Sequence, residues 1–364
     1  MNSPNTSKKA ILVEKSWLIP FILVTFLFFL WGFPNDLTNP MVEVFKNVLN
    51  ISNVKASYVQ LAFYGGYGTM AIPAALFIRK YRYKSGIILG LLLFMLGSFL
   101  MLPAAKMINY ELFLISFYVL TFGLAFLETT ANPMILAMGD PVTATQRLNL
   151  AQAFNPIEAL SGQIVARVFV VNRLETKIGA STSSLETSQE TILHDLNVVS
   201  TPYVILGFIV LGVLIIFFLT EIKIKNPTDI TLDLKATIRA LLKNKNYYEG
   251  VIAQFFYVAC QIMVWTFIYQ YITALNAELA IDQQLNPTVY VVTSTLCFLL
   301  ARWICTFLIR YIPSAKLLLI FAILGSSFCL GAIVLGGMLG LYLLIGFLFY
   351  VIDVPNYLRH FTLP

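Results

Sequence analysis

The chain has 364 residues, of which 59% are hydrophobic and 12% are charged, and its mean hydropathy is +0.80. Soluble domains carry about 25% charged residues, so the composition excludes an ordinary soluble protein and indicates an all-α protein that crosses a membrane repeatedly. The net charge of +6 comes from lysines and arginines beside apolar segments, so it does not indicate nucleic-acid binding. The two histidines and four cysteines lack metal-ligand spacing, so we expect no metal site, no cofactor and no enzymatic activity.

Ten apolar segments follow one another along the chain. Most have about 20 residues, which is enough to cross a hydrocarbon core of roughly 30 Å. The last segment is the shortest and stops before Asp353. We expect membrane spans at residues 17–33, 57–78, 86–105, 110–138, 147–172, 201–220, 247–275, 288–310, 314–336 and 339–352.

Positively charged side chains gather in alternate loops between these spans. Examples are Arg79, Lys80, Arg82 and Lys84, which lie between the second and third spans. Cytoplasmic loops of membrane proteins carry such an excess of lysine and arginine. We therefore expect an integral protein of the bacterial inner membrane with its N-terminus in the cytoplasm. The polar loop at 172–200 is expected to be exposed.

The longest charged inner segment follows the sixth span and suggests two halves. Arg79 after the second span has a counterpart, Arg310, after the eighth, and the same shift carries the first span onto the seventh. We predict an N-terminal six-helix half at 1–220, a cytoplasmic linker at 221–246, and an incomplete C-terminal half of about four helices at 247–364. Residues 233–242 of the linker are expected to form a short helix on the membrane surface.

Glu128 interrupts the fourth apolar segment. An ionisable side chain in the middle of a span costs roughly 2.5–3.5 kcal/mol and usually faces a wet cavity where it has a function. The alternative is a place near a helix end, from which the side chain reaches water.

Several polar strings inside the spans are distinctive. They read F-L-W-G-F at 29–33, A-F-Y-G-G-Y at 62–67, L-E-T-T-A-N-P at 127–133, R-L-N-L-A-Q-A-F-N at 147–155 and A-Q-F-F-Y-V-A-C-Q at 253–261. Together they resemble the L-fucose/proton symporter family of the major facilitator superfamily over about residues 17–348. The resemblance implies two parallel six-helix halves, with about ten of the twelve helices present, and a sugar site between the halves. It also implies proton-driven sugar import by a monomer in the lipid bilayer.

The resemblance implies roles for individual residues. It gives Glu128 the role of the proton-coupling acid. Gln152 and Asn155 lie three residues apart on one helical face and can bind sugar hydroxyls, although bonding between helices is the alternative. Trp31 can offer a flat face to a sugar ring or, alternatively, anchor the membrane interface. The implied sugar-binding residues are Trp31, Asn39, Asn132, Gln152, Asn155, Gln254, Tyr257, Gln261, Trp265 and Phe298.

The sequence departs from the family pattern at the first span. The family pattern N-N-L-N-D ends in an acid, whereas this chain reads N-D-L-T-N at 35–39, so Asn39 stands where aspartate is expected. Asp36, three residues earlier on the same face, is the candidate replacement, and the proton stoichiometry stays open. Glu158 and Arg167 are further ionisable residues in the fifth span, too far apart to pair on one helix.

The tail after about residue 348 also departs from the family. This tail can be written in codons that, in a reading frame shifted by one base, encode a different string. That string resembles the family's tenth helix. We hypothesise a single-base frameshift that truncated the product; the alternative is a true ten-span protein. The predicted function is import of L-fucose or a related hexose. The alternatives are a uniporter for another sugar or polyol, and a non-transporting or defective relic.

Overall fold

The computed structural model describes residues 12–176, 188–222, 234–280, 283–309 and 311–350. Within these ranges the chain forms helices joined by turns, without strands. The predictions about the tail after residue 350 lie outside the described residues, as does part of the predicted linker.

The chain divides into two compact units. The first unit comprises residues 1–144 and 157–228, and the second comprises 145–156 and 229–364. The predicted boundaries of the two halves and the linker stay a prediction.

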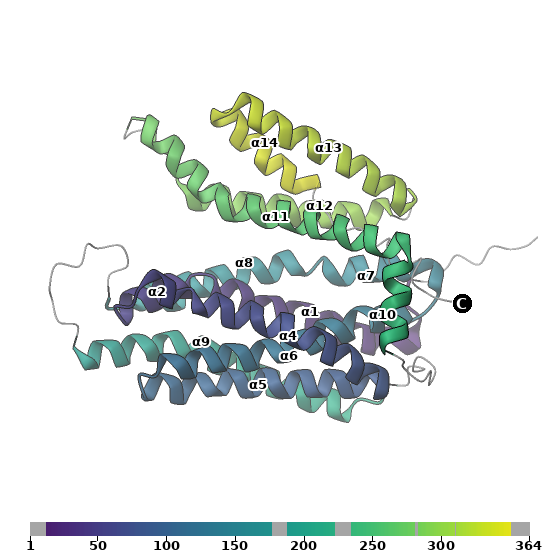
Figure 1. The fold of residues 1–364 in the computed structure, drawn as a ribbon, viewed down its shortest axis with the longest axis horizontal. Helices are drawn as coiled ribbons and strands as arrows, with labels where there is room; N and C mark the ends of the chain where they lie inside the picture. The colour runs from purple at the N-terminus through teal and green to yellow at the C-terminus, as the bar shows by residue number, and fades with distance from the viewer. Residues whose placement is uncertain (1–11, 177–187, 223–233, 281–282, 310, 351–364) are drawn as a thin grey trace, which may run out of the picture. The chain divides into compact units, whose positions relative to one another are not determined.

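The first unit is built on long helices, and Figure 1 shows several of them running side by side. Helix α6 packs against α4 and α5, and α5 also packs against α9. The long helices are α1 (Leu18–Thr38), α4 (Tyr58–Lys80), α5 (Tyr83–Lys106), α6 (Tyr110–Ala137) and α9 (Gln189–Leu219). The short ones are η1 (Lys15–Trp17), α2 (Met41–Val48), α3 (Asn53–Ala56), η2 (Pro141–Thr143), α8 (Asn155–Val165), η3 (Ala166–Val170) and η4 (Val171–Arg173).

Glycines let α5 and α6 approach closely. A side chain added at Gly97 would meet the backbone of Leu120, and one added at Gly123 would meet the backbone of Phe94. Small residues are typical of helix contacts inside membranes, where van der Waals packing is the main attraction. This contact holds α6 in place at the centre of the unit.

A hydrogen bond between side chains ties α1 to α9. The hydroxyl groups of Thr38 and Tyr203 lie 2.9 Å apart, and both side chains are buried. The Tyr203 ring also packs edge-on against Phe117 of α6, at 5.5 Å between ring centres. The end of α1, which carries Asp36 and Asn39, is therefore fixed against two other helices.

Among the described residues, the second unit contains one short helix from the first part of the chain and five from the last part. Helix α14 packs against α11, α12 and α13. Gly336 and Gly337, both with positive φ, form the turn between α13 and α14, a backbone conformation that favours glycine. The helices are α7 (Ala144–Gln152), α10 (Leu234–Lys243), α11 (Lys245–Glu278), α12 (Pro287–Leu308), α13 (Ser314–Leu335) and α14 (Gly337–Tyr350).

Most of the predicted spans correspond to helices. Among the described residues, seven helical segments are long and apolar enough to cross a membrane, and α14 is apolar but shorter. The short linker helix is also present, as α10. The seven segments are Lys15–Val48, Asn53–Lys80, Tyr83–Lys106, Tyr110–Ala137, Gln189–Leu219, Val289–Leu308 and Lys316–Leu335.

The fifth predicted span, at 147–172, is not one continuous helix. Helix α7 ends at Gln152, two residues in a turn follow, and α8 begins at Asn155. Pro156 explains the break, because it has no N–H to donate to the Gln152 carbonyl oxygen in a continuous helix, whereas proline is accepted in the first turn of a new helix. The expected exposed loop at 172–200 is also shorter than predicted. Helix α9 starts at Gln189, where the Ser188 hydroxyl accepts a hydrogen bond from the Thr191 backbone N–H.

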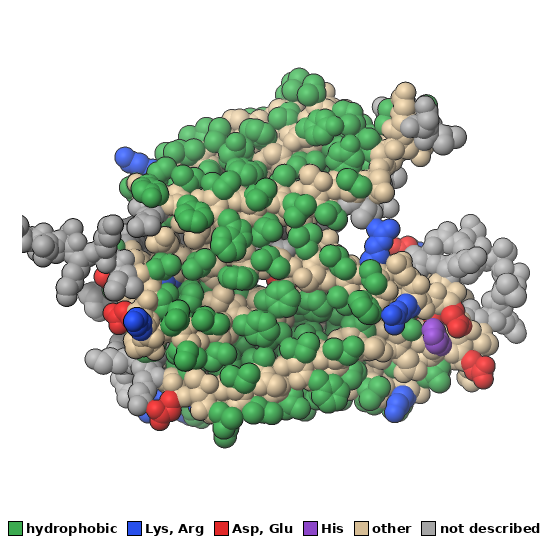
Figure 2. Space-filling model, turned by 180° about the vertical axis from the view of Figure 1, so that it is seen from behind, with side chains coloured by type: hydrophobic (Ala, Val, Ile, Leu, Met, Phe, Trp, Pro, Cys, Tyr) green, Lys and Arg blue, Asp and Glu red, His purple; other side chains and the backbone are tan. Residues whose placement is uncertain are grey.

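The helices present apolar side chains outward. Figure 2 shows hydrophobic side chains along the helices, with charged side chains of the described residues mainly near helix ends. On α9 alone, Ile205, Phe208, Phe218 and Leu219 are more than half exposed. Soluble proteins rarely expose so much contiguous apolar surface, so this surface fits contact with lipid.

Candidate functional site

A cavity in the first unit is lined in part by Glu128. The cavity has a volume of about 490 Å³ and lies between α4 and α6. Its lining is formed by Tyr67, Gly68, Ala71, Ala125, Glu128, Thr129 and Asn132.

Glu128 is exposed at this cavity rather than at a helix end. It lies nine residues before the end of α6 at Ala137, which is about 13 Å at the helical rise of ~1.5 Å per residue. Two interpretations of Glu128 were open: an acid that faces a cavity within the span, or an acid near a helix end that reaches water. The geometry favours the first.

Asn132 lies one helical turn after Glu128 and lines the same cavity. Its Nδ2 atom donates to the Glu128 backbone carbonyl oxygen at 3.0 Å. Its Oδ1 atom is buried and has no hydrogen-bond partner among the described residues. A buried acceptor without a donor is costly, and this oxygen belongs to a residue that lines the cavity beside Glu128.

The polar end of α1 lies in the same unit. Asp36 accepts a hydrogen bond from Gln163 Nε2 at 3.2 Å. Asn39 is exposed at the end of the helix, where its backbone N–H donates to the Asn35 carbonyl oxygen. Trp31 is only 8% exposed, and its ring lies 4.2 Å from that of Phe28. Trp31 therefore offers little free face to a sugar ring in this arrangement.

A second group of predicted residues meets in the second unit. Gln152, at the end of α7, accepts a hydrogen bond from Arg302 Nη1 at 3.1 Å. The Arg302 guanidinium also lies over the Phe298 ring, 5.2 Å from its centre. One turn further along α12, the Thr306 hydroxyl accepts a hydrogen bond from Asn149 Nδ2 at 2.7 Å. The string R-L-N-L-A-Q thus supplies amides that bind directly to α12.

Arg302 is the site residue that the sequence analysis missed. The signal was present, because Arg302 is the only ionisable side chain other than a tyrosine or cysteine between Pro287 and Leu308. Charged residues inside spans are rare and usually functional. Its side chain is 6% exposed, and it contacts the Gln152 amide and the Phe298 ring.

The remaining predicted residues are less well grouped. Asn155 begins α8, and its Oδ1 atom is buried without a hydrogen-bond partner among the described residues. Gln254, Tyr257 and Gln261 are half-buried on α11, where Tyr257 packs beside Phe347 and Leu348 of α14. The side chain of Trp265 lies outside the described residues.

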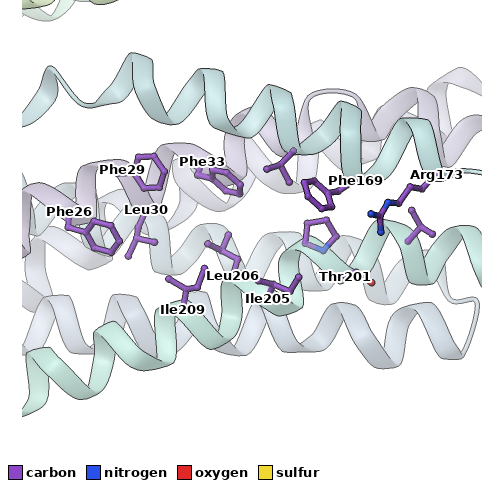
Figure 3. Close-up of a pocket in the computed structure, with 13 residues that line it drawn as sticks. Phe26, Phe29, Leu30, Phe33, Phe169, Arg173, Thr201, Ile205, Leu206 and Ile209 are labelled. Atoms are coloured by element: carbon purple, nitrogen blue, oxygen red, sulfur yellow. The ribbon is translucent and has the colours of Figure 1, made fainter.

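A second hollow, of about 370 Å³, lies between α1, α9 and residues 165–173 (Figure 3). Phe26, Phe29 and Phe33 of α1 face Ile205 and Ile209 of α9 across it. This lining offers few hydrogen-bond partners to a sugar, so we place the candidate sugar contacts on the polar groups above. Among the described residues, no group of three or more histidines, cysteines or acids is arranged to hold a metal ion.

Comparisons with known proteins agree with this architecture. The model of the Major Facilitator Superfamily matches residues 24–359. The L-fucose-proton symporter of Haemophilus influenzae is 48% identical over 343 residues, which are 92% of this chain and 78% of that protein. The L-fucose-proton symporter of Escherichia coli is 32% identical over 338 residues, covering 90% of this chain and 76% of that protein.

The fold is also similar to a solved structure. The crystal structure of the E. coli fucose:proton symporter superposes with a TM-score of 0.77 and 29% sequence identity, covering 94% of this chain and 83% of that one. The expected all-α fold and the family resemblance are therefore confirmed. The chain belongs to the Major Facilitator Superfamily and, within it, to the family of the L-fucose-proton symporters.

Proposed function

We propose that this protein imports L-fucose or a related hexose together with protons, by alternating access. The observation that carries the proposal is Glu128, a carboxyl group that lines a cavity well inside a membrane-length helix. The names of its relatives support the same function and support a transporter rather than an enzyme.

Glu128 is the proposed proton carrier. A carboxylate in a cavity within the membrane takes up a proton when the cavity opens to one side and releases it when the cavity opens to the other. Protonation removes a charge that is costly to move through a low-dielectric interior. Asp36, at the end of α1, is the second proposed proton-coupling acid, in keeping with its place near the acid position of the family pattern.

Amide groups are the proposed sugar contacts. Asn132 presents an unpaired oxygen in the Glu128 cavity, so it can accept a hydroxyl beside the proton carrier. Gln152 retains its two N–H donors, because Arg302 occupies only its oxygen. Trp31, Asn39, Asn155, Gln254, Tyr257, Gln261, Trp265 and Phe298 complete the proposed set of sugar-binding residues.

The cellular setting is also part of the proposal. The chain is an integral membrane protein by family and by its apolar helices. We place it in the bacterial inner membrane as a monomer, with its N-terminus in the cytoplasm. Basic residues such as Arg79 and Lys80 at the end of α4 support this orientation.

Sugar-driven proton movement tests the proposal. Purified protein is reconstituted into vesicles in an unbuffered medium, and the external pH is recorded while L-fucose is added. Uptake and counterflow of labelled L-fucose are measured on the same vesicles. Proton-coupled import alkalinises the medium. Uptake of labelled L-fucose without alkalinisation would indicate a uniporter instead. Binding without counterflow would indicate a non-transporting relic.

A further inference from the structure

Glu158 of α8 is a buried acid that the proposed function does not use. Its side chain is 6% exposed, and its Oε2 atom has no hydrogen-bond partner among the described residues. The carboxylate lies directly against Gly32 of α1, where even an added methyl group would overlap it. Within the unit, no described lysine or arginine forms an ion pair with it.

Asp195 is another buried acid of this unit, and both of its carboxylate oxygens have partners. It is fully buried on α9, where its two oxygens accept backbone N–H groups from Glu175 at 2.9 Å and Thr176 at 3.0 Å, and its Oδ1 atom also lies 3.2 Å from His194 Nδ1. Those hydrogen bonds compensate for the hydrogen bonds to water that the Asp195 carboxylate loses on burial. Glu158 lacks any such pair of donors. An unpaired charge in an apolar interior is strongly disfavoured, so the group binds a proton instead.

Asp36 faces Glu158 from the neighbouring helix. Asp36 lies one turn after Gly32 on α1, and Gly162 of α8 leaves room for it, since a side chain at Gly162 would meet the Asp36 Cβ. The two carboxyl groups are close enough to interact electrostatically. Like charges at short range oppose double ionisation, so ionisation of one of the two groups disfavours ionisation of the other.

Tyr67 of α4 connects this pair to the Glu128 cavity. Tyr67 lines the cavity and interacts electrostatically with both Glu128 and Glu158. Tyr64, one turn earlier on α4, interacts with Asp36. The titratable groups that interact with Glu158 are Asp36 from α1 and Tyr67 from α4. Neither of them supplies a positive charge.

We infer that Glu158, paired with Asp36, is a second proton-binding site that communicates with Glu128 through Tyr67. Binding converts a carboxylate and a proton into a carboxylic acid, and release reverses that step without any other bond change. The use of this site in transport rests on the proposed function, whereas the site itself can be detected without transport.

Infrared spectroscopy of the purified protein tests the site directly. At neutral pH, we expect a stretching band from a protonated carboxyl group that disappears in E158Q and persists in E128Q. The matched control is E111Q, because Glu111 is exposed and ion-paired with Lys55 at 3.5 Å; it should leave the band unchanged. A band unchanged in E158Q would overturn the inference. If E158Q does not fold, D36N should shift the same band, and an unshifted band would overturn the inference equally.

The proton-to-sugar ratio, measured from the reversal potential in vesicles, tests the role of the site in transport. We expect E158Q to lower the ratio by one proton while L-fucose counterflow is retained. An unchanged ratio would overturn the transport role. The two experiments can also give different answers. If E158Q loses the infrared band but the wild-type protein shows no sugar-driven proton movement, the proton-binding site is supported and the proposed function is rejected.

Discussion

Gln152 at the end of α7 accepts a hydrogen bond from Arg302 of α12, with 3.1 Å between Oε1 and Nη1. Of these two residues, sequence analysis found the glutamine and missed the arginine. Their contact makes a predicted sugar-binding amide the neutral acceptor of a charge-assisted hydrogen bond. The amide is held in a fixed orientation, with its N–H donors left for a ligand.

A double-mutant cycle on this pair should show strong coupling. Hydrogen bonds to charged groups contribute about 1.5–3 kcal/mol, so Q152A alone should weaken L-fucose binding about tenfold or more. R302M should cost a similar amount, and the double variant should be little worse than either single one. Titration calorimetry on the four proteins measures the coupling. Strictly additive losses would show that the two side chains act separately.

The bond between Asn149 and Thr306 should contribute to stability. Both residues are buried, and the Thr306 hydroxyl accepts from Asn149 Nδ2 at 2.7 Å. T306V removes the acceptor at nearly constant volume, so we expect a loss of roughly 0.6–1.7 kcal/mol, the range for such bonds between membrane helices. T306S keeps the hydroxyl and should stay near wild type. Thermal unfolding in detergent compares the three proteins; equal melting temperatures for T306V and T306S would contradict the assignment.

A side chain at Gly32 should displace the Glu158 carboxylate. G32A places a methyl group onto this carboxylate, which is the end of a flexible side chain and can shift, so we expect a loss at the low end of the overpacking range, about 1 kcal/mol. The double variant G32A/E158A removes the overlap and should recover most of the stability. G212A is the control, because a methyl group at Gly212 of α9 meets nothing within 4 Å. Failure of the double variant to recover would mean that Gly32 is needed for another reason.

Asn132 should affect sugar binding more than stability. N132A removes the unpaired oxygen in the cavity and a local bond to the Glu128 carbonyl oxygen. We expect L-fucose affinity to fall by about 0.5–1.5 kcal/mol, the usual contribution of one hydrogen bond. N197A is the matched control: Asn197 makes the same local bond, to the Leu193 carbonyl oxygen at 2.8 Å, on a helix that does not line this cavity. Equal affinities of N132A and N197A for L-fucose would show that Asn132 does not contact the sugar.

The long helices were predictable because their signal is local. The helices α4, α5 and α6 are long apolar runs bounded by charged or polar turns, so length and hydropathy place them within a few residues. The break between α7 and α8 was missed for a different reason. Pro156 marks the break, but the spacing of the polar residues around it predicts site residues on one continuous helix.

The candidate site was predictable only where a residue interrupts an apolar run. Glu128 was found in this way, and Arg302 could have been found by the same signal. The packing of Glu158 against Gly32 has no such signal, because the two residues are far apart in sequence and meet only when α1 packs on α8. The unpaired state of the Glu158 oxygen depends on that packing as well.

The central claim is that Glu128 couples the proton to the sugar, and E128Q tests it most directly. Counterflow of labelled L-fucose and sugar-driven alkalinisation are measured in the same vesicle preparation. The amide imitates the protonated acid, so counterflow should continue while alkalinisation and accumulation driven by a pH gradient are lost. Accumulation of L-fucose by E128Q at the wild-type level under an imposed pH gradient would contradict the account.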